Sequence, residues 1–121
     1  MLRVVVTGIG VISPLGSGAS ENLANARAGR SGIQRLAAPW AARLQSPVVA
    51  AARFDGAEHF AAPRLRMLDR ATQLALVAAD QALSDSGCVL GDCERSRVGV
   101  FVGTGMGGSQ STDDGYQVLY G

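Results

Sequence analysis

The sequence predicts an α/β fold built from crossover units with parallel strands, and three observations lead to it. A valine-rich run near the N-terminus passes directly into glycines. A long central segment has apolar residues at helical spacing, and a second apolar run followed by glycines comes after it. A strand, a helix and a second strand in this order are typical of a parallel crossover unit, whose connection is nearly always right-handed.

The first predicted strand covers Leu2–Thr7, which is apolar on both faces, as expected of a buried strand. Glycine, serine and proline dominate Gly8–Ser20, which predicts a loop. A short helix is expected from Ser20 to about Ala28, because Gly29 follows it as a stop signal. Residues 29–47 show no regular pattern.

The middle of the chain contains the clearest helix signal. Val48–Phe54 predicts a short strand or one arm of a hairpin. Between Pro63 and Gly87 the apolar spacing predicts a helix over about Met67–Asp85, and Gly87 is a suitable C-terminal stop. Its contact stripe is mostly alanine, which lets a neighbouring element come close: Met67, Ala71, Leu74, Ala75, Ala78 and Ala82.

The last third of the chain repeats the opening pattern. A charged turn at Asp92–Arg97 precedes a predicted strand at Val98–Val102, and glycines at 103, 105, 107 and 108 follow. Such a bare backbone is often approached closely by a ligand or another chain. A further helix should begin between Ser109 and Thr112. We expect Val4–Val6 and Val98–Val102 to lie side by side and parallel, with the central helix in a right-handed crossover between them.

The amino-acid composition limits the classes of protein to which this chain can belong. The chain has 121 residues, is 47% hydrophobic and has a net charge of +1, which fits one globular domain or part of a larger one. All eleven basic residues are arginines scattered along the chain, so neither a nucleic-acid nor a membrane partner is expected. No apolar run reaches the length of a membrane span or forms a signal peptide, and a cytoplasmic location is expected.

The opening glycines resemble a dinucleotide fingerprint only in part. Gly8 and Gly10 fit its first two positions, but Ser13 occupies the third, and no acidic residue lies between Glu21 and Asp55 to bind a ribose. The absence of lysine excludes a P-loop. The favoured interpretation is a tight turn or a close contact with a neighbouring element.

Neither the cysteines nor the single histidine predicts a metal or cofactor site. Cys88 and Cys93 lie five residues apart, with His59 far from them in sequence, and a metal site would need two further ligands. Both cysteines follow a predicted helix C-terminus and lie beside acidic residues, which favours the neutral thiol. We therefore expect free thiols, no metal and no cofactor.

Four motifs in this order and spacing resemble one family over essentially the whole chain. The motifs are "VVVTGIGVISPLG", "SGI" at Ser31–Ile33, "ALSDSG" at Ala82–Gly87 and "RVGVFVGTGMGG" at Arg97–Gly108. With them, the chain looks like the N-terminal portion of β-ketoacyl-[acyl carrier protein] synthases, the elongating condensing enzymes of fatty-acid and polyketide synthesis.

The resemblance implies a thiolase-type fold, in which residues 1–121 form the N-terminal segment of the first βαβαβαββ half and the remainder of the fold is absent. It also implies a decarboxylative condensation of an acyl thioester with malonyl-acyl carrier protein, usually in a homodimer. The nucleophilic cysteine and two histidines of the family lie downstream of the matched region, so no catalytic residue carries over. The 121-residue chain alone is expected to be inactive.

One position carries over from the resemblance. The glycine-rich stretch after the second strand borders the acyl pocket of the family, and its one large residue acts as a gate. That residue is Met106, flanked by Gly105 and Gly107.

Two other hypotheses for the function stay open: a non-catalytic partner of the chain-length-factor type, and a small nucleotide-binding α/β protein.

Overall fold

The computed structural model describes residues 3–88, 91 and 96–121. The expected charged turn at 92–97, including Cys93, therefore lies largely outside the described residues. The helices are α1 (Ala19–Arg27), α2 (Ala62–Leu65), α3 (Arg70–Ser86) and α5 (Ser109–Tyr120), with 3-10 turns η1 (Pro39–Arg43) and η2 (Gly56–Glu58). The strands have two residues each: β1 (Ile12–Ser13), β2 (Gly16–Ser17), β3 (Gln34–Arg35) and β4 (Val48–Val49).

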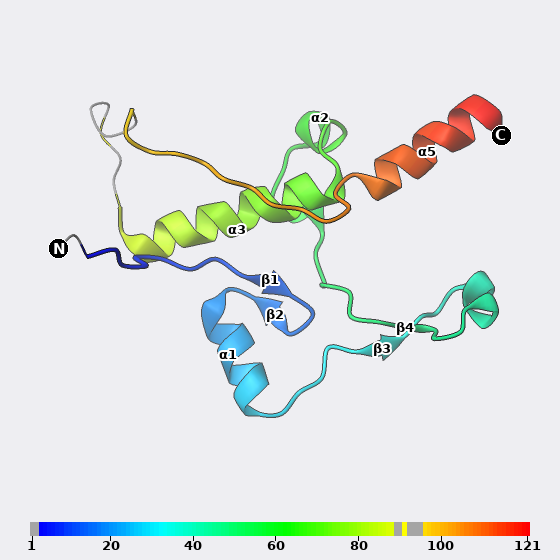
Figure 1. The fold of residues 1–121 in the computed structure, drawn as a ribbon, viewed down its shortest axis with the longest axis horizontal. Helices are drawn as coiled ribbons and strands as arrows, with labels where there is room; N and C mark the ends of the chain where they lie inside the picture. Colours follow the sequence, from blue (N-terminus) through cyan, green and yellow to red (C-terminus); the bar gives the residue numbers. More distant parts are fainter. Residues whose placement is uncertain (1–2, 89–90, 92–95) are drawn as a thin grey trace.

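The strands form two small antiparallel sheets. In the first, β1 pairs with β2, placing Ile12 opposite Ser17. In the second, β3 pairs with β4, placing Gln34 opposite Val49. The prediction of a hairpin arm after residue 47 is confirmed for Val48–Val49. Figure 1 shows α3 across the middle of the molecule, the β1–β2 hairpin and α1 on one side of it, and α5 leading away toward the C-terminus.

Within the described residues 3–7 and 98–102, the parallel strands predicted at Leu2–Thr7 and Val98–Val102 are not present. Residues 3–7 and 98–102 run as extended chain in the same direction across the view of Figure 1, but the described residues include no backbone partner for either. Valine-rich composition favours a strand only where a neighbouring strand completes the hydrogen-bond ladder. Instead, Val4 and Phe101 are each 96% exposed.

The central helix is confirmed, and local signals explain both of its ends. The Asp69 carboxylate accepts hydrogen bonds from the Thr72 backbone N–H at 3.0 Å and from the Thr72 hydroxyl at 2.9 Å, which caps the N-terminus of α3. Gly87 ends the helix in the left-handed conformation, with φ of 62°. Because Asp69 sets the start, Met67 lies outside the helix and is exposed rather than part of the contact stripe.

Gly8 and Gly10 bring the N-terminal segment onto the alanine stripe of α3. A Cβ built on Gly8 would overlap the carbonyl oxygen of Ala82, and one built on Gly10 would overlap that of Ala78. Neither glycine has a positive φ. The predicted close contact with a neighbour is therefore confirmed, and these glycines make room for a helix rather than for a phosphate.

Side chains of α3 complete the backbone hydrogen bonding of this segment. The Ile9 N–H donates to Asp85 Oδ2 at 2.9 Å, and the Val11 N–H donates to Gln81 Oε1 at 3.0 Å. These two N–H groups, two residues apart, lie on one edge of the extended chain. Two side chains of α3 therefore hold the backbone at residues 9 and 11.

Helix α1 begins one residue earlier than predicted and holds the hairpin loop. Asn22 Nδ2 donates to the carbonyl oxygens of Gly16 at 2.9 Å and Gly18 at 2.8 Å. Asn25 Nδ2 donates to the Leu15 carbonyl. These side-chain amides add hydrogen bonds to the loop carbonyls at residues 15, 16 and 18.

Few side chains are buried. Among the described residues, Ala41 and Val77 form the buried hydrophobic core.

The predicted last helix is present as α5 and begins at Ser109, the earlier end of the expected range. Within the described part of the chain, no helix is both long and apolar enough to cross a membrane.

Candidate functional site

Met106 lies in the turn that leads into α5. Gly108, with φ of 80°, precedes the helix in the left-handed conformation and redirects the chain. The Met106 side chain is 82% exposed. The predicted gate residue is thus an accessible thioether beside the start of a helix, not part of a packed core.

A hollow of about 310 Å³ lies between this turn and the first two turns of α5. Its lining consists of Met106, Gly107, Ser109, Thr112, Asp113 and Tyr116. Of the three residues predicted for the site, Met106 and Gly107 border this hollow, whereas Gly105 does not. Ser109, Thr112 and Tyr116 were not predicted, although their spacing of three and four residues places them on one helix face.

The glycines of this stretch differ in how much space surrounds them. A Cβ built on Gly107 would lie 2.8 Å from Thr104 Oγ1 and 3.4 Å from the Ala71 Cβ in α3. No atom lies within 4 Å of a Cβ built on Gly105. The bare backbone therefore serves a close contact at Gly107, whereas Gly105 borders open space.

Two polar groups of the hollow already have partners. The Thr112 hydroxyl donates to the Gly108 carbonyl oxygen at 3.0 Å. Asp113 Oδ2 accepts from Gln117 Nε2 at 3.1 Å. Ser109 and Tyr116 carry the other hydroxyls of the lining.

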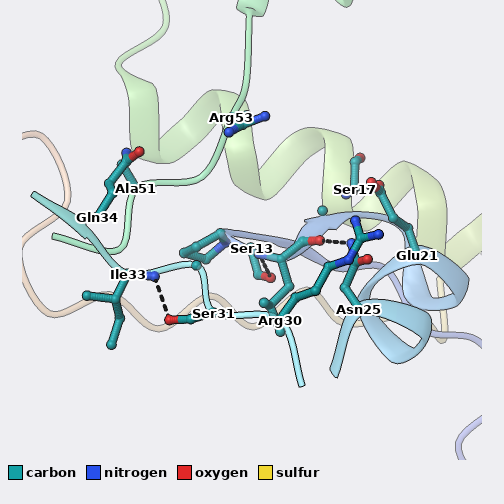
Figure 2. A pocket seen from close by; sticks show the side chains of 14 residues that line it. Ser13, Ser17, Glu21, Asn25, Arg30, Ser31, Ile33, Gln34, Ala51 and Arg53 are labelled. Atoms are coloured by element: carbon teal, nitrogen blue, oxygen red, sulfur yellow. Dashed lines mark hydrogen bonds between the residues drawn. The ribbon is translucent and has the colours of Figure 1, made fainter. Parts of the chain in front are cut away.

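A second and larger hollow of about 500 Å³ lies beside the β1–β2 hairpin and α1. Figure 2 shows the Arg30 side chain extending toward Asn25 and Glu21. The lining of this larger hollow comes from four separate segments, near residues 13–17, 21–25, 30–34 and 51–53. No local spacing in the sequence could therefore have predicted the hollow. Glu21 accepts from the Ser17 N–H at 2.8 Å, and Ser13 binds Asn22, so these groups serve the hairpin rather than a reaction.

His59 and Cys88 lie outside the Met106 hollow, as expected of structural or surface residues. The His59 ring stacks on Phe54 with centroids 5.1 Å apart and planes within 3°. The Arg64 guanidinium lies over Phe60, 5.4 Å from the ring centroid. Cys88 is exposed. Within the described ranges, no three His, Cys, Asp or Glu side chains come together as a metal site.

Comparison with known proteins assigns the family. Residues 1–120 match the family model described as Beta-ketoacyl synthase, N-terminal domain. Over 97% of its length, the chain is 36% identical to the granaticin polyketide β-ketoacyl synthase 1 of Streptomyces violaceoruber. Over the same share it is 36% identical to the 3-oxoacyl-[acyl-carrier-protein] synthase 2 of Coxiella burnetii. The chain spans 28% of the length of each relative. Because the match extends through nearly every residue, the chain belongs to the β-ketoacyl synthase family and corresponds to its N-terminal domain.

Proposed function

We propose that the protein is a 3-oxoacyl-[acyl carrier protein] synthase of fatty-acid or polyketide synthesis. The match of residues 1–120 to the N-terminal domain of the family carries this proposal. In the proposed reaction, malonyl-acyl carrier protein loses carbon dioxide, and the resulting carbanion attacks an enzyme-bound acyl thioester. A carbon–carbon bond forms and the cysteine thiolate leaves. Acyl carrier protein is the proposed partner, and the proposed assembly is a cytoplasmic homodimer.

Residues 1–121 would supply the N-terminal segment of the first thiolase-type half. The two extended segments at residues 3–7 and 98–102 would then become strands of a larger parallel sheet. Their exposed apolar side chains support this, because Val4, Val100 and Phe101 are each at least 85% exposed, as expected of residues that a larger sheet would cover. Catalytic cysteine and histidine residues would come from the rest of the family fold.

Met106, with Gly105 and Gly107, would form the gate of the acyl pocket. Two features support this role. The side chain is accessible, and it borders a hollow large enough to take part of an acyl chain. A flexible thioether can change its rotamer to admit chains of different shape.

The test uses the protein expressed from its complete reading frame, supplied with octanoyl- and malonyl-acyl carrier protein. We expect release of carbon dioxide, formation of 3-oxodecanoyl-carrier protein, and an acyl-enzyme adduct visible by mass spectrometry. The 121-residue chain alone serves as the control and should form no product. A folded protein that binds the carrier protein but forms neither adduct nor product would contradict the proposal and favour a non-catalytic chain-length factor.

A further inference from the structure

We propose that the hollow beside the β1–β2 hairpin and α1 binds an organic bisphosphate, a small molecule with two phosphate groups joined by a hydroxyl-bearing body. The guanidinium groups of Arg30 and Arg53 would each hold one phosphate. This hollow shares no lining residue with the one beside Met106, and the inference does not depend on the proposed function.

Part of the chain that builds this hollow is strongly basic. Residues 22–54 contain five arginines and no aspartate or glutamate, whereas the whole chain has a net charge of only +1. These arginines are Arg27, Arg30, Arg35, Arg43 and Arg53, and two of them, Arg30 and Arg53, line the hollow. A local excess of positive charge raises the concentration of anions near the surface, so it favours a negatively charged ligand.

The two arginines of the hollow are unpaired within the part of the chain that the structure describes. There, neither guanidinium donates a hydrogen bond or lies within 4.0 Å of a carboxylate oxygen. Glu21 is the one carboxylate among the lining residues, and it accepts from the Ser17 N–H at 2.8 Å. An unpaired guanidinium offers a planar fork of N–H donors that matches the oxygens of a phosphate.

Hydrogen bonds from α3 fix the backbone on both sides of Arg53. Arg70 Nη1 donates to the Phe54 carbonyl oxygen at 3.2 Å, and Arg70 Nη2 donates to the Ala52 carbonyl oxygen at 3.0 Å. The Arg70 guanidinium also lies over the Phe54 ring, 5.7 Å from its centroid. Because the residues before and after Arg53 are held in place, less backbone freedom is lost when its side chain binds a ligand.

The end of α1 fixes the backbone at Arg30. The Arg30 N–H donates to the Asn25 carbonyl oxygen at 3.0 Å, and the Asn25 side chain in turn binds the Leu15 carbonyl of the hairpin loop. Figure 2 shows Arg30 beside α1 and Arg53 on the segment that follows β4, with the two side chains apart from each other. This placement favours a ligand with two separated phosphates over a single phosphate.

Hydroxyl groups of the lining can bind the body of such a ligand. Ser17 Oγ accepts from Gln81 Nε2 at 2.9 Å, and Ser31 Oγ accepts from the Ile33 N–H at 3.2 Å. Because both hydroxyls already act as acceptors, their own O–H groups are left to donate to a ligand oxygen. The volume of about 500 Å³ is within the range of small-molecule sites, so the hollow has room for an organic body as well as phosphates.

The experiment measures dissociation constants by isothermal titration calorimetry on the protein expressed from its complete reading frame. The probes are fructose 1,6-bisphosphate, ADP, inorganic pyrophosphate and inorganic phosphate. We expect fructose 1,6-bisphosphate to bind about tenfold more tightly than inorganic phosphate, because its second phosphate adds a charge-assisted hydrogen bond. ADP and pyrophosphate carry adjacent phosphates, which reach only one of the two arginines, and should bind less tightly than the bisphosphate.

Substitutions assign the binding to this hollow. Arg30→Gln and Arg53→Gln should each weaken bisphosphate binding by about tenfold, since each loses a charge-assisted hydrogen bond. Glu21→Gln keeps an acceptor oxygen but removes the negative charge of the lining, and should strengthen binding by about threefold. Arg27→Gln and Arg43→Gln are the matched controls. They remove arginines of the same basic stretch that do not line the hollow, and the affinity should stay within about twofold of the wild type.

Three results would overturn this inference. The first is the absence of bisphosphate binding, and the second is binding that is no tighter than that of inorganic phosphate. The third is an equal loss of affinity in the test and control variants, which would show a general attraction to positive charge. Circular dichroism of each variant, compared with the wild type, verifies that the protein is folded. Because the readout is binding and not condensation, failure of this inference would leave the proposed function standing.

Discussion

The backbone of Gly10 lies against the carbonyl oxygen of Ala78 in α3, with no space for a side chain between them. Gly8 meets Ala82 in the same way, one helical turn further along. These contacts join the N-terminal segment to the longest helix of the chain. The family motif "VTGIG" thus has a packing role in this structure: its glycines admit a helix backbone.

Replacing Gly10 with alanine should separate this segment from α3. A methyl group there would overlap the Ala78 carbonyl, and we expect a loss of about 1–3 kcal/mol in the free energy of local opening. Hydrogen exchange of the Ile9 and Val11 amides measures that opening. Gly103→Ala is the control, because no atom lies within 4 Å of its added Cβ. Equal protection in both variants would show that the contact at Gly10 does not hold the segment.

Removing the Asp85 carboxylate should expose the Ile9 amide. Asp85→Ala deletes the acceptor at 2.9 Å, and exchange of the Ile9 amide should become about five to ten times faster. Asp85→Asn keeps an acceptor oxygen and should restore most of the protection. Asp80→Ala, a change on the same helix at a carboxylate that binds no backbone N–H, should have no effect. Unchanged exchange in Asp85→Ala contradicts the proposed hydrogen bond.

The cap of α3 should weaken in acid. The Thr72 backbone N–H, assisted by the Thr72 hydroxyl, lowers the pKa of Asp69 below its ordinary value of 3.8. Because the folded pKa lies below the unfolded one, the stabilisation is fully present above the unfolded pKa and is lost as the pH falls through the folded pKa.

This acid sensitivity can be assigned with one substitution. Asp69→Asn keeps a good capping oxygen but removes the titration, so circular dichroism of the variant should lose less helix between pH 5 and pH 2 than the wild type. Asp80→Asn removes a carboxylate from α3 that caps nothing and should follow the wild-type curve. Superimposable curves for wild type and Asp69→Asn would contradict the capping role.

Replacing Met106 with a larger side chain should restrict the enzyme to shorter acyl chains. In the enzyme from the complete reading frame, Met106→Trp should block long acyl groups while short ones still react, and Met106→Ala should admit bulkier ones. Gly107→Val should impair even short substrates, because its Cβ would lie 2.8 Å from Thr104 Oγ1. Met67→Trp enlarges another exposed methionine, outside the hollow, and is the control. A length profile unchanged by Met106→Trp in a folded enzyme would make Met106 a packing residue.

The sequence by itself determined the features that depend on residues close together along the chain. The long helix could be predicted because its alanine stripe and its stop at Gly87 are local signals. Its start was predicted at about Met67, three residues before Arg70, because the cap at Asp69 was not recognised. The family could be recognised for a similar reason, since its motifs are short strings in a set order. The close contact made by Gly8 and Gly10 also followed from their lack of a side chain.

The tertiary structure alone decided the features that need a distant partner. Valine-rich runs at residues 3–7 and 98–102 predict strands, but a strand exists only where another supplies its hydrogen bonds. Among the described residues, neither run has such a backbone partner. The same holds for the site. Met106 was predicted from a motif, whereas Ser109 and Tyr116 were identified only from the structure, as residues that line the same hollow. A backbone turn fixes which helix face a loop meets, and residue types do not encode that direction.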